Sequence, residues 1–252
     1  MNTFLTLPLR RQTLVTTSDG YAVWQSSEQE WRLSVERLAI IVCDVWDHHW
    51  CRGAEERLNK MVARMNEVLC AARSCGAHII HAPSDTMAFS GDQPARQRIA
   101  GLAPTCMPVE QAHADPPLPI DASDGGCDVP GCITEYVWTR EHPAITVDAE
   151  RDVISDVGLE VYAYLQQQAI ELTLLMGVHT NMCILNRSFA IKQLVRWGVP
   201  VALLRDLTDA MYNPACAPYV SHEEGTALVI GYIEKHWCPT LPSVALLSQA
   251  GA

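Results

Sequence analysis

A cysteine that follows an apolar, strand-like run is the residue of this 252-residue chain with the clearest chemical potential. Residues 172–176 form the apolar run, Gly177 interrupts it, and an amphipathic helical pattern then places Cys183 in its first turn. The free N–H groups and the positive dipole end of a helix stabilise an anion, so a thiol at this position is expected to have a lowered pKa. The same N–H groups can hold a developing oxyanion. A buried structural cysteine is the alternative interpretation.

An aspartate is the best candidate for a base that would activate this thiol. Asp44 follows the wholly apolar run of residues 38–43. A carboxylate at the end of a buried strand can have a raised pKa, which suits a general base. The carboxyl ends of parallel strands share one edge of a sheet, so Asp44 and Cys183 can meet in space. A role in a loop or a helix cap is the alternative for Asp44.

The segments that must position these groups alternate between strand and helix patterns. Strands are expected at residues 38–43, 77–81, 136–139, 171–176 and 199–204, and helices at 54–75, 94–102, 157–168, 181–197 and 221–237. This alternation predicts an α/β fold with a doubly wound, mostly parallel sheet and helices on both faces. We expect one domain over residues 37–252, preceded by an N-terminal β extension over 1–36. That extension is interpreted as an added β layer, with a dimerisation or lid element as the alternative.

Two motifs resemble those of the isochorismatase-like cysteine hydrolases, a superfamily with nicotinamidases, N-carbamoylsarcosine amidohydrolases and isochorismatases among its members. Residues 177–184, GVHTNMCI, resemble its nucleophile signature, and residues 38–47 resemble the signature in which an aspartate ends the first core strand. The resemblance covers roughly residues 36–238. It implies a three-layer sandwich in which Cys183 attacks an amide carbonyl to form a thioester, with Asp44 as base.

The resemblance also implies how the reacting oxygen would be held. The backbone N–H groups of His179 and Cys183 would form the oxyanion hole. A cis peptide bond between Val178 and His179 would precede it.

The lysine of the superfamily's triad has no counterpart where it is expected. The chain has three lysines, and none lies at that position: Lys60, Lys192 and Lys235. Arg140 is the expected substitute, because a guanidinium can hold Asp44 and favour a thiolate by its charge. It cannot shuttle a proton, since it does not deprotonate in proteins. A surface ion pair with Glu141 or another nearby acid is the alternative for Arg140.

Four further residues are expected to line the substrate pocket: Trp46, His49, Asp85 and Met211. Nicotinamidases of this superfamily bind a divalent ion through an Asp-x-His motif, which the corresponding segment 81–86 lacks. We therefore expect no cofactor and no metal at the site. A divalent metal such as zinc, held by His48 or His49 with His81 and Asp85, is the less favoured alternative.

Composition restricts the partners and the setting of the protein. A net charge of −11 argues against nucleic acid and anionic membranes, which require clustered basic charge. The ten cysteines include no CxxC pair, and a bridge between Cys127 and Cys132 is left open. A chain of this length does not need a disulfide framework, so a reducing, cytoplasmic setting is expected. The superfamily resemblance implies a homo-oligomer.

The expected function is therefore a cysteine-dependent hydrolase that cleaves a C–N amide bond of a small, uncharged or anionic molecule. Three alternatives stay open at this point: a non-catalytic binding protein of the same fold, an isochorismatase-type vinyl ether hydrolase, and a metal-dependent hydrolase. The irregular, proline-rich segment of residues 82–134 and the N-terminal extension are expected to shape substrate specificity.

Overall fold

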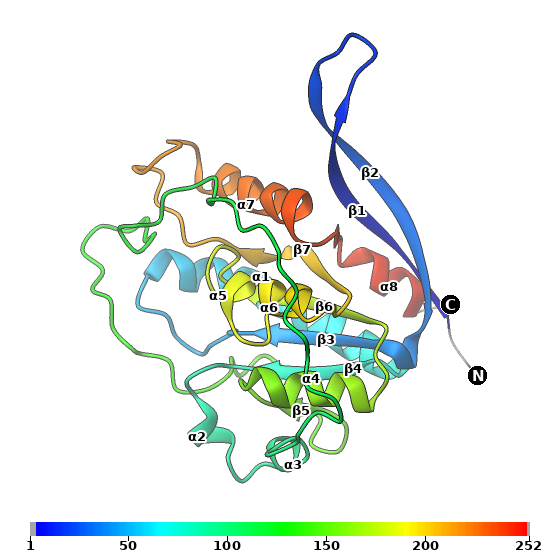
Figure 1. The fold of residues 1–252 in the computed structure, drawn as a ribbon. Helices are drawn as coiled ribbons and strands as arrows, with labels where there is room; N and C mark the ends of the chain where they lie inside the picture. The colour runs from blue at the N-terminus through cyan, green and yellow to red at the C-terminus, as the bar shows by residue number, and fades with distance from the viewer. Residues whose placement is uncertain (1–3, 251–252) are drawn as a thin grey trace.

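An eight-stranded sheet organises the protein, whose structure is a computed structural model that describes residues 4–250 (Figure 1). The strand order is β2-β1-β8-β7-β6-β3-β4-β5. The strands are β1 (Phe4–Thr16), β2 (Ala22–Ser34), β3 (Leu38–Cys43), β4 (His78–Ala82), β5 (Val153–Ile154), β6 (Leu172–Val178), β7 (Val201–Asp209) and β8 (Thr240–Leu241). The helices are η1 (Val35–Arg37), α1 (Arg52–Cys75), α2 (Met87–Ser90), α3 (Pro94–Gln97), α4 (Gly158–Gln167), α5 (Cys183–Asn186), α6 (Ile191–Arg196), α7 (His222–His236) and α8 (Val244–Ala250).

Helices cover both faces of the central parallel strands. Every residue of β3 and β6 is buried, as expected for strands packed on both sides. On one face α1 and α8 pack against side chains such as Ile40 and Leu174. On the other face α4, α6 and α7 pack against side chains such as Ile41 and Leu175. The predicted doubly wound α/β sheet is confirmed.

The order of the central strands explains why two distant segments meet at one edge. Strand β3 pairs in parallel with β4 on one side and with β6 on the other, so the direction of winding reverses here. Cys43 lies opposite Gly177 in this register. Gly177 has a φ of 124°, and a Cβ atom there would overlap the carbonyl oxygen of Cys43. This close approach brings the residues after β3 beside those after β6.

The helix predicted over residues 181–197 is broken into α5 and α6. Arg187 has a ψ of 153°, which ends α5 after four residues. The chain then passes close to the start of α4, where the backbone N–H of Gly158 donates to Ser188 Oγ at 3.0 Å. A Cβ atom at position 158 would overlap the backbone of Ser188. Periodicity indicated one helix because the apolar positions continue across the break.

The strand predicted at residues 136–139 does not form. This segment is irregular, and the only β pairing nearby is an isolated bridge between Trp46 and Glu141. Thr139 instead donates from both its N–H and its hydroxyl to the carboxylate of Asp47, at 2.9 and 2.6 Å. This anchoring holds the segment as a loop across the residues that follow β3.

The N-terminal segment forms a long hairpin that extends away from the body of the molecule (Figure 1). The β extension predicted over residues 1–36 consists of two continuous 13-residue strands, joined by a turn that includes residues 18–20. The base of the hairpin is buried through Leu5, Leu7 and Leu9, whereas the residues of β2 from Ala22 to Arg32 are exposed. Strand β1 also pairs with β8, so the hairpin continues the main sheet.

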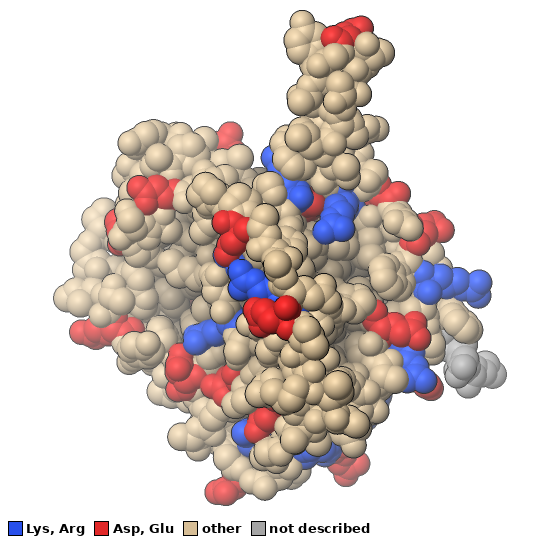
Figure 2. Space-filling view, in the orientation of Figure 1, with Lys and Arg blue, Asp and Glu red and all other residues tan. Residues whose placement is uncertain are grey.

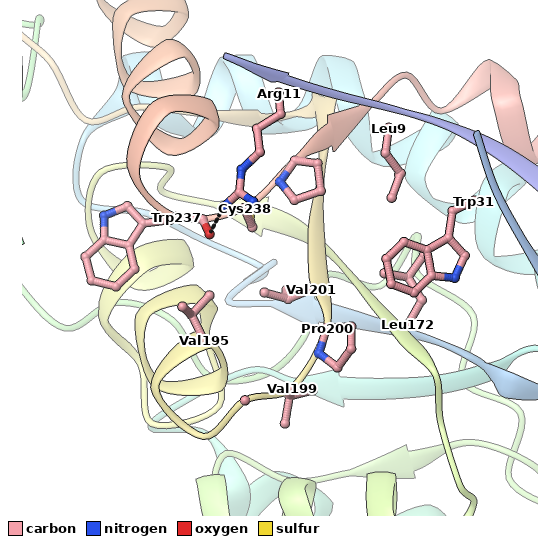
Figure 3. A pocket seen from close by; sticks show the side chains of 12 residues that line it. Leu9, Arg11, Trp31, Leu172, Val195, Val199, Pro200, Val201, Trp237 and Cys238 are labelled. Carbon is pink, nitrogen blue, oxygen red and sulfur yellow. Dashed lines mark hydrogen bonds between the residues drawn. The ribbon is translucent and has the colours of Figure 1, made fainter. Parts of the chain in front are cut away.

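A hollow of about 290 Å³ lies where the hairpin meets the body (Figure 3). Leu9 and Trp31 from the hairpin face Val199 and Pro200, and Arg11 donates to the carbonyl oxygen of Trp237 at 3.0 Å. Its lining includes the first residues of β6 and β7, so it lies at the opposite end of these strands from Asp44 and Cys183. It therefore does not belong to the site predicted from the sequence.

The surface and the helices add two observations on partners. On the face drawn in Figure 2, acidic and basic side chains are interspersed, without a large continuous basic area. Within residues 4–250, none of the helices combines the length and the apolar character needed to cross a bilayer.

A buried charged network ties α1 to β4 and to the loop that carries Arg140. His81 in β4 is fully buried, with Nδ1 2.9 Å from Glu141 and Nε2 3.1 Å from Asp152. Arg73 in α1 donates to the same Asp152 carboxylate at 2.7 Å. Burial alone would lower the pKa of His81, but the carboxylates of Glu141 and Asp152 outweigh it and raise the pKa to about 9.

This network predicts a pH-dependent loss of stability. The folded protein holds the His81 proton more tightly than the unfolded chain, whose histidine has a pKa near 6.5. The stabilisation is therefore complete below pH 6.5 and is lost as the pH rises through about 9. We expect the free energy of unfolding in urea to fall over this interval, and His81→Gln to abolish most of that fall. His48→Gln is the control, because the His48 side chain is 62 % exposed; an unchanged pH dependence in His81→Gln would contradict the assignment.

Candidate active site

The chain places the Asp44 carboxylate at the edge where β3 and β6 end. Asp44 is fully buried and has a φ of 51°, so the chain turns sharply directly after β3. The backbone N–H of Ser84, just after β4, donates to Asp44 Oδ1 at 2.8 Å. Arg187 Nε donates to Oδ2, also at 2.8 Å. Burial raises the pKa of Asp44, and the charge of Arg187 opposes that rise.

The Cys183 thiol lies against this carboxylate. Cys183 is the first residue of α5, keeps partial solvent exposure, and its thiol interacts electrostatically with the Asp44 carboxylate. Burial and the neighbouring negative charge of Asp44 raise the pKa of the thiol to about 12. The resting thiol is thus neutral, and Asp44, when ionised, can accept the proton as the sulfur reacts.

The expectation of a lowered thiol pKa at a helix N-terminus is therefore wrong. Helix α5 has only four residues, so it offers a small dipole. The Asp44 charge and burial outweigh both the Arg187 charge and the backbone N–H of His179, which favour the thiolate.

The cation on Asp44 is Arg187, which corrects the expectation for Arg140. The Arg140 guanidinium lies 3.9 Å from Asp47 and against the ring of Phe89, with 44 % of its side chain exposed. The loop anchored by Thr139 on Asp47 carries Arg140 to this outer position. Arg187 lies one helical turn after Cys183, and its side chain also reaches Asp85 Oδ2 at 3.1 Å.

Two backbone N–H groups, those of His179 and Cys183, are the candidates for an oxyanion hole. The peptide bond between Val178 and His179 is cis, as the superfamily resemblance implies. The backbone N–H of His179 favours the thiolate form of Cys183. The N–H of Cys183 donates to no backbone acceptor within residues 4–250. A substrate oxygen bound beside the sulfur would therefore meet available donors.

Aromatic side chains form one wall beside the site. The rings of Trp46 and Trp138 stack with their centres 4.3 Å apart, and the His49 ring lies 6.0 Å from that of Trp138. His49 also contacts the His179 ring at 4.8 Å, which links this wall to the residues after β6. Burial lowers the pKa of His49, and burial together with the charge of His49 lowers that of His179 to about 3. Both imidazoles are therefore neutral near pH 7.

The other two predicted pocket residues lie on different sides of the site. Asp85 has a φ of 64°, and its exposed carboxylate accepts a hydrogen bond from Arg187. Met211 is buried, and its backbone N–H and C=O both bond to the side chain of Asn181, at 2.8 and 2.9 Å. Met211 packs with Met182, the neighbour of Cys183, so it supports the site from behind.

The structure does not assemble the metal site considered from the sequence. His81 is fully buried and both of its ring nitrogens contact carboxylates, Glu141 and Asp152. The Asp85 carboxylate is engaged in a hydrogen bond from Arg187. These residues therefore do not converge with His48 or His49 on a common ion.

Comparison with known proteins gives structural neighbours only. No protein-family profile and no curated protein sequence matches the chain. A cysteine hydrolase from Pseudomonas syringae pv. phaseolicola 1448A is similar at 16 % identity with a TM-score of 0.55, over 88 % of this chain and 95 % of that one. A Burkholderia xenovorans LB400 protein described as an isochorismatase is similar at 16 % identity with a TM-score of 0.50, over 85 % of this chain and 88 % of that one. The chain has the isochorismatase-like fold.

Within this isochorismatase-like fold, sequence reasoning missed three residues that complete the site. Arg187 follows Cys183 by four positions, and helical spacing was the signal that could have identified it. Ser84 supplies the N–H that fixes Asp44, and its hydroxyl is buried without a partner among the residues whose side chains the structure describes. Trp138 completes the aromatic wall, and no sequence signal separated it from its loop neighbours.

The pH profile of any reaction at this site should report Asp44. The carboxylate must be ionised to accept the thiol proton, so activity is lost as the pH falls through its pKa. Because burial raises that pKa above 3.8, we expect the acid limb of kcat/KM to have its midpoint above pH 3.8. Asp121→Asn, on an exposed loop, should keep the limb in place. A midpoint at or below 3.8 would show that Asp44 is not the group that titrates.

Proposed function

We propose that the protein is a cysteine-dependent hydrolase that cleaves a C–N amide bond of a small molecule through a thioester. The observation that carries the proposal is the contact of the Cys183 thiol with Asp44, whose second oxygen holds Arg187 at 2.8 Å. A thiol, an acceptor for its proton and a fixed cation are what nucleophilic attack on a carbonyl requires.

The reaction follows from where protons and charge can go. The sulfur of Cys183 attacks the carbonyl carbon while its proton passes to Asp44. The N–H groups of His179 and Cys183 stabilise the oxyanion, and protonated Asp44 returns the proton to the leaving amine as the C–N bond breaks. Asp44 then takes a proton from water, which attacks the thioester and releases the acid and the free thiol.

Arg187 acts in this scheme by position and charge. A guanidinium stays protonated throughout, so it does not shuttle protons. It holds Asp44 Oδ2, while Oδ1 accepts the N–H of Ser84. Its charge also favours the ionised form of both Asp44 and Cys183.

The surroundings favour a flat, uncharged or anionic substrate. The stacked rings of Trp46 and Trp138 offer an aromatic wall, and the indole nitrogen of Trp138 is buried without a partner among the described side chains. His49 and His179 are neutral, so Arg187 is the fixed positive charge at the Asp44 carboxylate.

Product analysis tests this assignment. We expect the purified protein to release ammonia or an amine, with the matching carboxylic acid, from at least one member of a panel of small aromatic and aliphatic carboxamides. Cleavage of isochorismate without any amide turnover would replace the proposal by the vinyl ether reaction. Binding without turnover across the panel and isochorismate would favour the non-catalytic protein.

A further inference from the structure

A second group of reactive side chains lies away from the Cys183 thiol. The sulfur atoms of Cys51, Cys127 and Cys132 all lie within 4.8 Å of one another. Within residues 4–250 this is the only group of three or more histidine, cysteine, aspartate or glutamate residues whose ligand atoms converge in this way. Cys51 and Cys127 are joined by a disulfide, not the Cys127–Cys132 bridge left open from the sequence.

The disulfide does not account for the third sulfur. A disulfide uses two cysteines, and Cys132 remains as a free, half-buried thiol beside it. Cys127 and Cys132 flank four residues, Asp-Val-Pro-Gly, which gives the C-x4-C spacing seen in structural zinc sites. Three converging sulfurs on such a loop are a ligand set for a soft or borderline metal ion.

The surroundings favour sulfur in its charged form. Cys51 is the N-cap residue of α1, a 24-residue helix whose positive dipole end favours a thiolate. Arg57, six residues further along the same helix, donates to Asp128 Oδ2 at 2.7 Å. Zinc with three thiolates has a net charge of −1, which this guanidinium can balance.

A fourth ligand is also within reach. Asp128 Oδ1 lies 3.8 Å from Cys51 Sγ, and Asp128 directly follows Cys127. Tetrahedral zinc with Zn–S bonds of about 2.3 Å places its sulfur ligands roughly 3.8 Å apart. The sulfurs of Cys51 and Cys127 must therefore move apart after reduction to admit the ion.

We propose that Cys51, Cys127 and Cys132 bind zinc when the disulfide is reduced. A thiol or phosphine reductant supplies two electrons, two protons complete the thiols of Cys51 and Cys127, and the reductant is oxidised. Zn²⁺ then binds three thiolates, releases three protons and takes the Asp128 carboxylate or water as fourth ligand. The cluster packs beside Met211 and Trp50, so the bound ion holds the 121–132 loop against the start of α1.

Cobalt substitution tests the site without use of the proposed hydrolase activity. The full-length Cys183→Ala protein is reduced with tris(2-carboxyethyl)phosphine, freed of reductant without oxygen, and titrated with Co²⁺. We expect one equivalent of cobalt to give sulfur-to-cobalt charge-transfer absorption and tetrahedral visible bands, both of which one equivalent of Zn²⁺ removes. Cys132→Ser should lose these bands.

The matched control is Cys106→Ser, which changes an exposed free cysteine and should keep the full signal. Circular dichroism shows whether each variant is folded, and Cys51→Ser provides a second test if Cys132→Ser is not. Absence of a thiolate–cobalt band in the reduced protein, or an undiminished band in the folded Cys132→Ser protein, would overturn the zinc site. Because Cys183 is absent throughout, either result leaves the proposed hydrolase unaffected.

Discussion

Replacement of Cys183 by alanine is expected to abolish amide hydrolysis, with kcat reduced by about 10⁴-fold or more. The sulfur is the atom that forms the thioester, and it interacts with both Asp44 and the N–H of His179. The measurement is kcat on any carboxamide that the wild-type protein hydrolyses.

The fold should tolerate this change. Cys183 is partly exposed at the start of a four-residue helix, so the loss of one sulfur is expected to change the free energy of unfolding by only about 1 kcal/mol. Cys106→Ala is the matched control, because Cys106 is an exposed free cysteine far along the chain. Retained turnover in a folded Cys183→Ala protein would remove the thioester mechanism.

The second large effect is expected from Arg187. Arg187→Ala leaves the buried Asp44 carboxylate with the Ser84 N–H but without its cation, so the pKa of Asp44 should rise further. We expect kcat/KM near pH 7 to fall by about a hundredfold and the acid limb of the profile to move to higher pH. Arg187→Lys should recover part of the rate, because a lysine keeps the charge but not the geometry of the guanidinium.

Arg140→Ala separates the two arginines. Its guanidinium lies near Asp47 and Phe89, with 44 % of the side chain exposed, so we expect kcat/KM to stay within about twofold of wild type. A strong loss in Arg140→Ala combined with a mild one in Arg187→Ala would reverse the assignment made from the structure.

The sequence was sufficient for the parts of the site that depend on local pattern and sheet order. Asp44 and Cys183 each follow an apolar strand, and the alternation of strands and helices predicts that such strand ends share an edge. Register then explains their contact, because Cys43 lies opposite Gly177. The cis bond before His179 came from the superfamily resemblance.

The features that the sequence did not predict depend on helix ends, loop conformations and long-range contacts, which hydrophobic periodicity does not encode. Arg187 reaches Asp44 because the helix predicted over 181–197 ends after Asn186. Arg140 lies away from the site because Thr139 binds Asp47, a contact between an irregular loop and the residues after β3. The pairing of Cys51 with Cys127 joins positions 76 residues apart, which spacing alone does not reveal.

Several expectations remain predictions. Homo-oligomerisation stays a prediction, and the exposed strand β2 of the hairpin is the segment through which it can be examined. The substrate pocket roles of Trp46, His49, Asp85 and Met211 also stay predictions. Met211 packs against Met182, next to Cys183, whereas the rings of Trp46 and His49 belong to the aromatic wall beside the site.

The proton shared between Cys183 and Asp44 is the central claim, and the pH dependence of alkylation of Cys183 by iodoacetamide tests it without knowledge of the substrate. Peptide mass spectrometry gives the rate at this cysteine alone. In the wild-type protein we expect the rate to keep rising as the pH passes 9.0, the ordinary pKa of a thiol, because burial and the Asp44 charge raise the pKa to about 12. Asp44→Asn should move the profile to lower pH. A wild-type rate that levels off below pH 9.0, or a profile that Asp44→Asn leaves unchanged, would contradict the account.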